Sequence, residues 1–321
     1  MRNIKQFVEN AFDLLNSKRK RWLERLIGVG ILAFSLVFLF IALVRGWAQL
    51  EPHLRDISFI PLVAGQFFIV IALLLGIVMW GVIQQAVGLG LGWQECVVIH
   101  LASNVTKYAP GYAWQYLGKA YIGRKRGGSS RQVVFMVLTE LVLLIIGGIF
   151  ITALWGLLSD QHWHFSPVRM RWVWLLSGVF ASLAAVGWNV LIPGLANGGD
   201  RLVRYPRLLW WALVVGMVGW FMFAIAAWFM SRSLYPVSLS TFPQHGVALV
   251  TSVVVGIAII VVPGGLGVRE ALLATLLTGV LPFTLGVVVG MLLRISIVFW
   301  ELVGFGLAFH LNRIHHMEFL S

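Results

Sequence analysis

Long apolar runs are the feature that most constrains what this chain can fold into. Hydrophobic residues fill 60% of its 321 positions and charged residues only 11%, whereas a soluble domain has about half and about a quarter. An apolar run of about 20 residues is long enough to cross a bilayer as a helix. We therefore predict an all-α polytopic membrane protein with about six full spans, at residues 26–44, 60–83, 132–157, 172–194, 208–230 and 284–310.

Two further apolar segments are interrupted. Residues 94–122 break at Ala109-Pro110-Gly111, and residues 246–282 break at the stretch V-V-P-G-G-L-G-V-R-E, 261–270. Non-helical backbone at membrane depth is tolerated only where protein or a water-filled cavity surrounds it. We predict that each segment is a re-entrant helical hairpin, with two full crossings as the alternative.

The distribution of basic residues predicts the orientation. With the N-terminus inside, 17 of the 24 Lys and Arg residues fall in cytoplasmic segments and 5 in outside loops, while Arg269 and Arg294 lie in apolar sequence. This is the positive-inside bias of a multi-pass plasma or inner membrane protein, N-in and C-in. It explains the net charge of +12 without nucleic acid. The predicted organisation is a basic interfacial segment 1–25, one transmembrane domain 26–310 and a short cytoplasmic tail 311–321.

The two interrupted segments form a weak internal repeat. Each has a glycine-proline break followed by a span that carries a glutamate, Glu140 in the first and Glu301 in the second. Three predicted spans separate the segments, so the hairpins should enter from opposite sides. That is an inverted repeat, an architecture of secondary transporters whose binding sites lie near the midplane where broken helices meet.

The second break has the residues of an anion site. Proline ends the preceding helix, glycines allow close approach to the backbone, and a new helix starting near Val268 presents unpaired N–H groups. Such a helix start attracts anions, and an arginine adds a fork suited to phosphate. We predict a phosphate-binding site formed by Pro263, Gly264, Gly265, Gly267, Arg269 and Glu270.

Other charges in apolar sequence need partners. A charge at the centre of a spanning helix costs about 2.5–3.5 kcal/mol on insertion scales. Arg294 and Glu301 lie two turns apart on one helix face. We expect Glu270 or Glu301 to neutralise Arg294, which leaves Arg269 for a ligand, and Glu140 to contribute to the same cavity. The alternative is that these charges only join helices together.

The first hairpin has lysines on both sides of its break. Lys107 and Lys119 flank Pro110 and Gly111, with aromatic residues between them. Lysines with amphipathic aromatics suit a lipid headgroup, so these four residues are also candidate ligand-binding positions. An ordinary interfacial aromatic belt with lysines that reach the surface is the alternative.

Catalytic signatures are absent from the sequence. It has no H-E-x-x-H, no G-x-S-x-G, no phosphate loop and no aspartate cluster, and Cys96 is its single cysteine. The pattern predicts no catalytic residue, no metal site and no cofactor, and thus not an enzyme.

The stretch P-G-G-L-G-V-R-E at 263–270, together with S-N-V-T-K-Y-A-P-G at 103–111 and Gly118-Lys119, resembles the lysylphosphatidylglycerol synthase transmembrane (flippase-like) family. The resemblance spans roughly residues 20–312 and implies a polytopic fold with broken helices. It also implies transfer of aminoacylated phospholipid between leaflets. Large members of that family continue into an aminoacyl-transfer domain. The chain ends 11 residues after its last predicted span, so we expect the transmembrane part only, and a separate lipid-modifying enzyme as a possible partner.

These observations predict an integral membrane lipid transporter. A phospholipid or polyprenyl-linked lipid would pass its phosphate headgroup through a polar midplane cavity while its acyl chains stay in the bilayer. Two alternatives stay open: a membrane-embedded transferase with Glu270 or Glu301 as base, and an accessory subunit that acts with an enzyme on a lipid-linked substrate.

Overall fold

A computed structural model describes residues 44, 51–53, 55–105, 107, 114–125, 127–158, 167–191, 203–258 and 267–314. These residues form helices and no strand. The main helices are α4 (Phe59–Val87), α5 (Trp93–Val105), α6 (Trp114–Lys125), α7 (Ser130–Leu158), α8 (Pro167–Val186), α10 (Arg207–Leu234), α11 (Phe242–Ala258), α12 (Val268–Leu276) and α13 (Phe283–Ile314). A π-helical turn, Gly187–Leu191, continues α8, and a 3-10 turn, Leu239–Thr241, leads into α11.

Six described helices are long and apolar enough to cross a membrane: Phe59–Val87, Arg131–Leu157, Arg171–Val190, Arg207–Leu234, Leu239–Ile257 and Phe283–Arg313. Five of them coincide with predicted spans, which confirms an all-α polytopic membrane protein. The sixth contains α11, which the sequence predicted as the first limb of an interrupted segment. The predicted span 26–44, apart from Val44, and the terminal segment 1–25 lie outside the described residues, as does the tail beyond Ile314.

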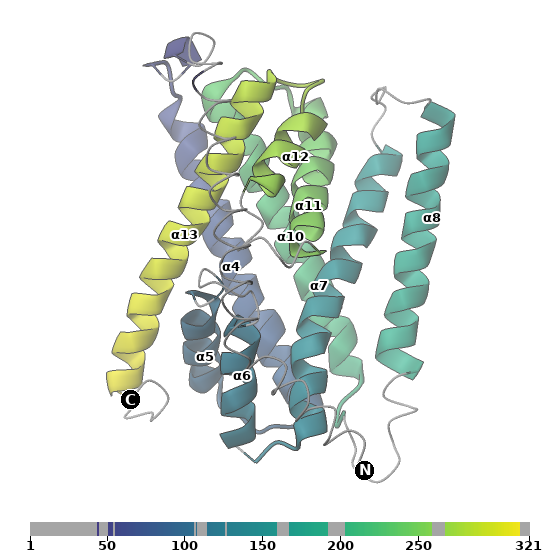
Figure 1. Ribbon diagram of the computed structural model, residues 1–321, viewed down its shortest axis with the longest axis vertical. Helices are drawn as coiled ribbons and strands as arrows, with labels where there is room; N and C mark the ends of the chain where they lie inside the picture. Colours follow the sequence, from purple (N-terminus) through teal and green to yellow (C-terminus); the bar gives the residue numbers. More distant parts are fainter. Residues whose placement is uncertain are drawn as a thin grey trace, which may run out of the picture.

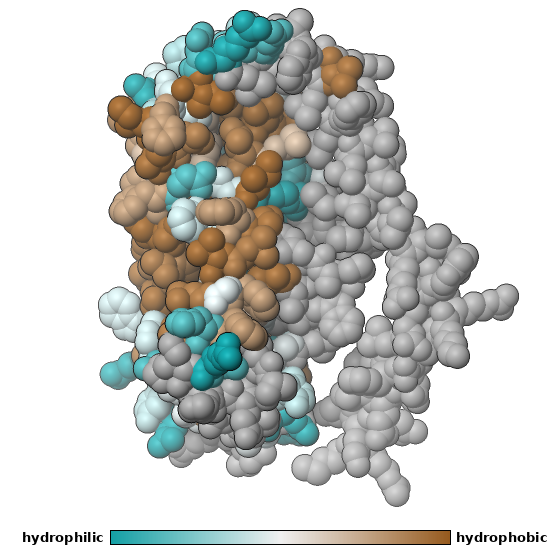
Figure 2. Space-filling view, turned by 90° about the vertical axis from the view of Figure 1, so that its left-hand side faces the viewer, coloured by the Kyte–Doolittle hydropathy of each residue, from teal (hydrophilic) through white to brown (hydrophobic). Residues whose placement is uncertain are grey.

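The surface has the layering of a membrane protein. In the view of Figure 2, a hydrophobic belt crosses the described part of the molecule between hydrophilic ends, and a few hydrophilic residues interrupt it at mid-height. Many large apolar side chains face outward, among them Phe67, Leu176 and Phe299. An exposed apolar surface of this extent is stable against lipid rather than water.

The helices form two groups of four with the same order. A long helix (α4 or α10) precedes a short hairpin (α5–α6 or α11–α12), which another long helix (α7 or α13) follows. Figure 1 shows α5 and α6 in the lower half of the molecule and α11 and α12 in the upper half. The hairpins therefore enter from opposite sides, as the predicted inverted repeat requires, while α8 lies beside α7.

Contacts between the groups follow the same symmetry. The first long helices, α4 and α10, pack along each other, whereas α5 contacts α13 and α11 contacts α7. Small residues permit this packing: a β-carbon added at Gly65 of α4 would lie 3.0 Å from the Cε of Met230 on α10. One added at Gly216 of α10 would lie 3.0 Å from the Sδ of Met79 on α4. Close approach through small residues is the usual way that membrane helices associate.

Glycines also fix the position of the second hairpin. A β-carbon at Gly286 of α13 would lie 2.7 Å from the Cα of Ala274, and one at Gly290 would lie 3.2 Å from the Cα of Glu270. These two glycines, four residues apart, let the backbone of α12 lie directly against α13. The N-terminal turn of α12 is thereby placed beside the part of α13 that carries Arg294.

Candidate functional site

The second break ends where the sequence predicted. Gly267 has a φ of 81°, in the left-handed region that favours glycine, and α12 begins at Val268. The Gly267 N–H donates to Oε2 of Glu270 at 2.7 Å. One amide predicted to await an anion is thus already satisfied by the carboxylate three residues later, as in a capping box. Pro263, Gly264 and Gly265 lie outside the described residues.

Glu270 has a second partner on the neighbouring helix. Nη1 of Arg294 donates to Oε1 of Glu270, while the side chain of Glu270 is almost fully buried. The expectation that Glu270 or Glu301 neutralises Arg294 is confirmed, and the partner is Glu270. Both oxygens of this carboxylate therefore accept hydrogen bonds, one from the start of its own helix and one from α13.

Arg269 differs from Arg294 in its surroundings. Its side chain lies against α11, where a β-carbon added at Gly256 would stand 2.4 Å from Nε of Arg269. Nε and Nη2 are buried and have no hydrogen-bond partner within the described residues. An unsatisfied buried donor costs about 1–3 kcal/mol, and more when it is charged. A negatively charged ligand would remove that cost.

The first hairpin contributes Lys107 to the same place. Lys107 follows the end of α5, and its Nζ donates to Oε1 of Glu301 on α13. This ion pair joins residues 194 positions apart. Glu301 is therefore a partner of Lys107 on the first hairpin, although it shares a helix with Arg294.

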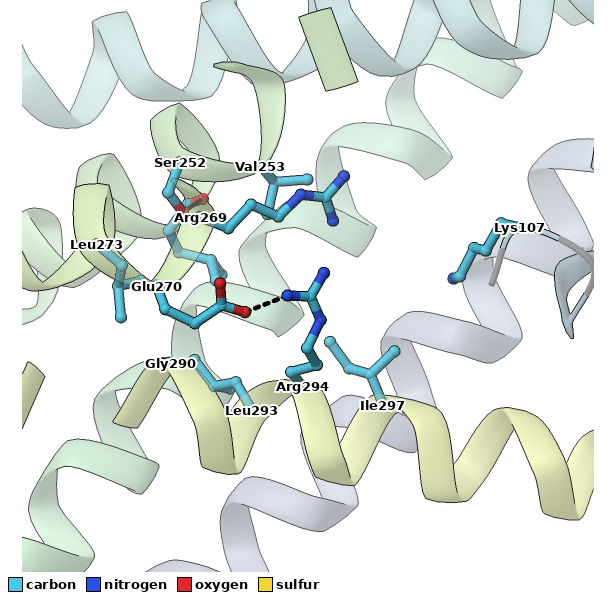
Figure 3. A pocket seen from close by; sticks show the side chains of 11 residues that line it. Lys107, Ser252, Val253, Arg269, Glu270, Leu273, Gly290, Leu293, Arg294 and Ile297 are labelled. Carbon is cyan, nitrogen blue, oxygen red and sulfur yellow. Dashed lines mark hydrogen bonds and ion pairs between the residues drawn. The ribbon is translucent and has the colours of Figure 1, made fainter. Parts of the chain in front are cut away.

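These side chains surround one pocket between the hairpins. Its empty space is about 630 Å³, part of which opens outward. Figure 3 shows the guanidinium groups of Arg269 and Arg294 projecting into it, with Lys107 on the opposite side. The described lining residues are Lys107, Leu249, Ser252, Val253, Arg269, Glu270, Leu273, Gly290, Leu293, Arg294 and Ile297. Three basic side chains thus line a pocket whose other described residues are mostly apolar.

Lys119 and Glu140 belong to a different cluster. Nζ of Lys119 donates to Oε1 and Oε2 of Glu140 at 2.5 and 2.8 Å and lies 3.3 Å from Nδ1 of His100. It also lies 4.5 Å from the centre of the Trp80 ring. Lys119 is 1% exposed, and none of these residues lines the pocket described above. The prediction that Lys119 and Glu140 share a cavity with Arg269 therefore differs from the observed geometry, because each charge is satisfied within the first hairpin and α7.

Two candidate ligand-binding residues and the question of a metal site remain. Pro110 and Gly111 lie outside the described residues. No group of three or more His, Cys, Asp or Glu residues suited to a metal ion occurs in the described ranges.

Sequence reasoning missed several residues that shape the site. Gly256 accommodates Arg269, and Gly286 and Gly290 hold α12 against α13. The four-residue spacing of the last two was a usable signal. A polar bridge was also missed: Gln66 donates to Ser296 at 2.6 Å and accepts from Trp300 at 2.8 Å, linking α4 to α13 between Arg294 and Glu301. In the sequence, the only indication of this bridge was the single glutamine, Gln66, within the apolar span 60–83.

No protein-family model matches the chain, and no curated protein matches it.

Proposed function

We propose that this membrane protein moves a phosphate-bearing lipid headgroup between the two leaflets through the pocket between its hairpins. The observation that carries the proposal is Arg269, a permanently charged fork whose Nε and Nη2 are buried in a pocket without a partner among the described residues. A phosphate oxygen is a good hydrogen-bond acceptor for such a donor. The acyl chains of the lipid would stay in the bilayer, outside the pocket.

The arrangement of the hairpins supports transport rather than binding alone. The lining residues come from both halves of an inverted repeat, since Lys107 follows α5 while the others belong to α11, α12 and α13. Sites at such junctions become open to each side in turn when one half moves against the other. The resemblance of the motif at 263–270 to flippase-like proteins agrees with this proposal. On the positive-inside bias of the basic residues, we propose a plasma or inner membrane location.

Reconstitution into liposomes tests the proposal. Purified protein is inserted into vesicles with a headgroup-labelled anionic phospholipid, and exchange between leaflets is followed by quenching of the outer label. We expect Arg269→Ala to slow exchange about tenfold or more, since a hydrogen bond to a charged group contributes about 1.5–3 kcal/mol. Arg171→Ala, at an exposed position of α8, is the matched control and should exchange normally. Equal rates in the wild type and Arg269→Ala would contradict the proposal.

A further inference from the structure

The charges around the pocket do not balance. Its described lining holds three cations, Lys107, Arg269 and Arg294, and one carboxylate, Glu270. Glu301, which does not line the pocket, forms an ion pair with Lys107, and Glu270 forms an ion pair with Arg294. One positive charge, that of Arg269, is left over among the described residues.

One surplus charge favours a ligand with one negative charge. A phosphodiester is a monoanion, and the planar guanidinium of Arg269 matches two of its oxygens. A phosphomonoester approaches two negative charges at neutral pH. It would leave an excess charge beside Leu249, Val253, Leu273, Leu293 and Ile297, and an unpaired charge in apolar surroundings is costly.

Among the described lining residues, the oxygens that could accept from an ammonium group already take part in hydrogen bonds. Both oxygens of Glu270 already accept hydrogen bonds, from Gly267 and Arg294. Ser252 is the one neutral residue of the described lining with a side-chain polar atom, and its hydroxyl donates to the backbone oxygen of Leu249 at 2.7 Å. An amine in the headgroup would therefore stand among three cations, where like charges repel it.

We infer that the pocket selects a lipid phosphodiester with a single negative charge and a headgroup that carries no amine, as in phosphatidylglycerol. The inference rests on the proposed function only in taking this pocket as the lipid site. Phosphomonoesters and lipids with an amine should therefore bind less tightly than glycerol or sugar phosphodiesters. The excluded lipids include the aminoacylated phospholipids that the resemblance to flippase-like proteins implied.

Binding without transport tests the inference. The whole protein in detergent is titrated by calorimetry with phosphatidylglycerol, phosphatidylethanolamine and phosphatidic acid of identical acyl chains. We expect phosphatidylglycerol to bind about tenfold or more tightly than either of the others. Arg269→Ala should remove this preference, and Arg269→Lys should keep part of it, which distinguishes a lost fork from a misfolded protein. Equal affinity for phosphatidylethanolamine would overturn the inference.

Two further measurements test the charge argument and the identity of the ligand. Glu301→Gln removes one negative charge beside Lys107 and should raise the affinity for phosphatidic acid relative to phosphatidylglycerol severalfold. An unchanged ratio would count against the charge argument. Inorganic phosphate should not displace the lipid at equal concentration, and displacement would identify a free-phosphate site instead. Selective binding of phosphatidylglycerol without leaflet exchange would contradict the proposed function but support this inference. Leaflet exchange without selective binding would support the proposed function but contradict this inference.

Discussion

Glu270 of α12 and Arg294 of α13 form an ion pair one helical turn beyond Gly290, the point where the two helices touch. The same carboxylate caps the start of α12 through the N–H of Gly267. One side chain thus fixes both the beginning of the short helix and its attachment to the long one. Arg269, its neighbour in sequence, is left to face the pocket.

Replacing Glu270 by Gln should destabilise the protein strongly. Gln keeps an oxygen for the Gly267 N–H, so the cap can persist, but the ion pair between residue 270 and Arg294 is lost. Breaking a buried pair costs about 3–5 kcal/mol, and the partial exposure of Arg294 reduces this. Thermal unfolding in detergent measures the effect. In the double variant with Arg294→Met, we expect much of the loss to be recovered, and strictly additive losses would show that the pair is not coupled.

Gly256→Ala should displace Arg269 while leaving the fold intact. The added methyl would lie 2.4 Å from Nε and 2.5 Å from Cγ of Arg269, so the whole side chain of Arg269 must move from its base. We expect leaflet exchange and phosphatidylglycerol binding to fall toward the level of Arg269→Ala, with little change in unfolding temperature. The matched control is Gly279→Ala, because no atom lies near a β-carbon at that position. Normal exchange in Gly256→Ala would mean that Arg269 does not need this position.

Gly286→Ala should loosen the attachment of α12. Here the new methyl meets backbone, at 2.7 Å from the Cα of Ala274, so the helices must separate. Overpacking of this kind costs about 1–3 kcal/mol. A lower unfolding temperature and faster proteolysis near α12 are the measurements, with Gly306→Ala on the same helix as the control that meets no neighbour.

The Lys119–Glu140 pair should matter for stability and not for ligand choice. Removing either partner alone leaves a buried charge and is expected to cost about 3–5 kcal/mol, whereas replacing both by Met costs far less. Calorimetry on the double variant should give the wild-type preference for phosphatidylglycerol. A changed preference would indicate that this cluster communicates with the pocket.

Much of the fold follows from the sequence because membrane crossing demands long apolar runs and breaks stand out within them. The start of α12 at Val268 and the positive φ of Gly267 were predictable for this reason. The pairing of Arg294 with one of two glutamates was predictable too, since an unpaired charge inside a span is costly.

The partners themselves were not predictable. Lys107 reaches Glu301 across 194 residues, because the first hairpin approaches α13 from the opposite side of the molecule. Lys119 has flanking aromatic residues in its sequence, which suggested a headgroup region. Its actual surroundings, Glu140, His100 and Trp80, come from three other helices that only the packing brings together.

The bond that ties each hairpin to the following long helix has opposite polarity in the two halves. In the first half the cation, Lys119, is on the hairpin and the carboxylate, Glu140, is on the long helix. In the second half the carboxylate, Glu270, is on the hairpin and the cation, Arg294, is on the long helix. A half-turn that superposes the helices would therefore exchange acid for base. The two groups repeat the same order of helices, but the charges that join hairpin to long helix are reversed between them, so the two ends of the molecule differ electrically.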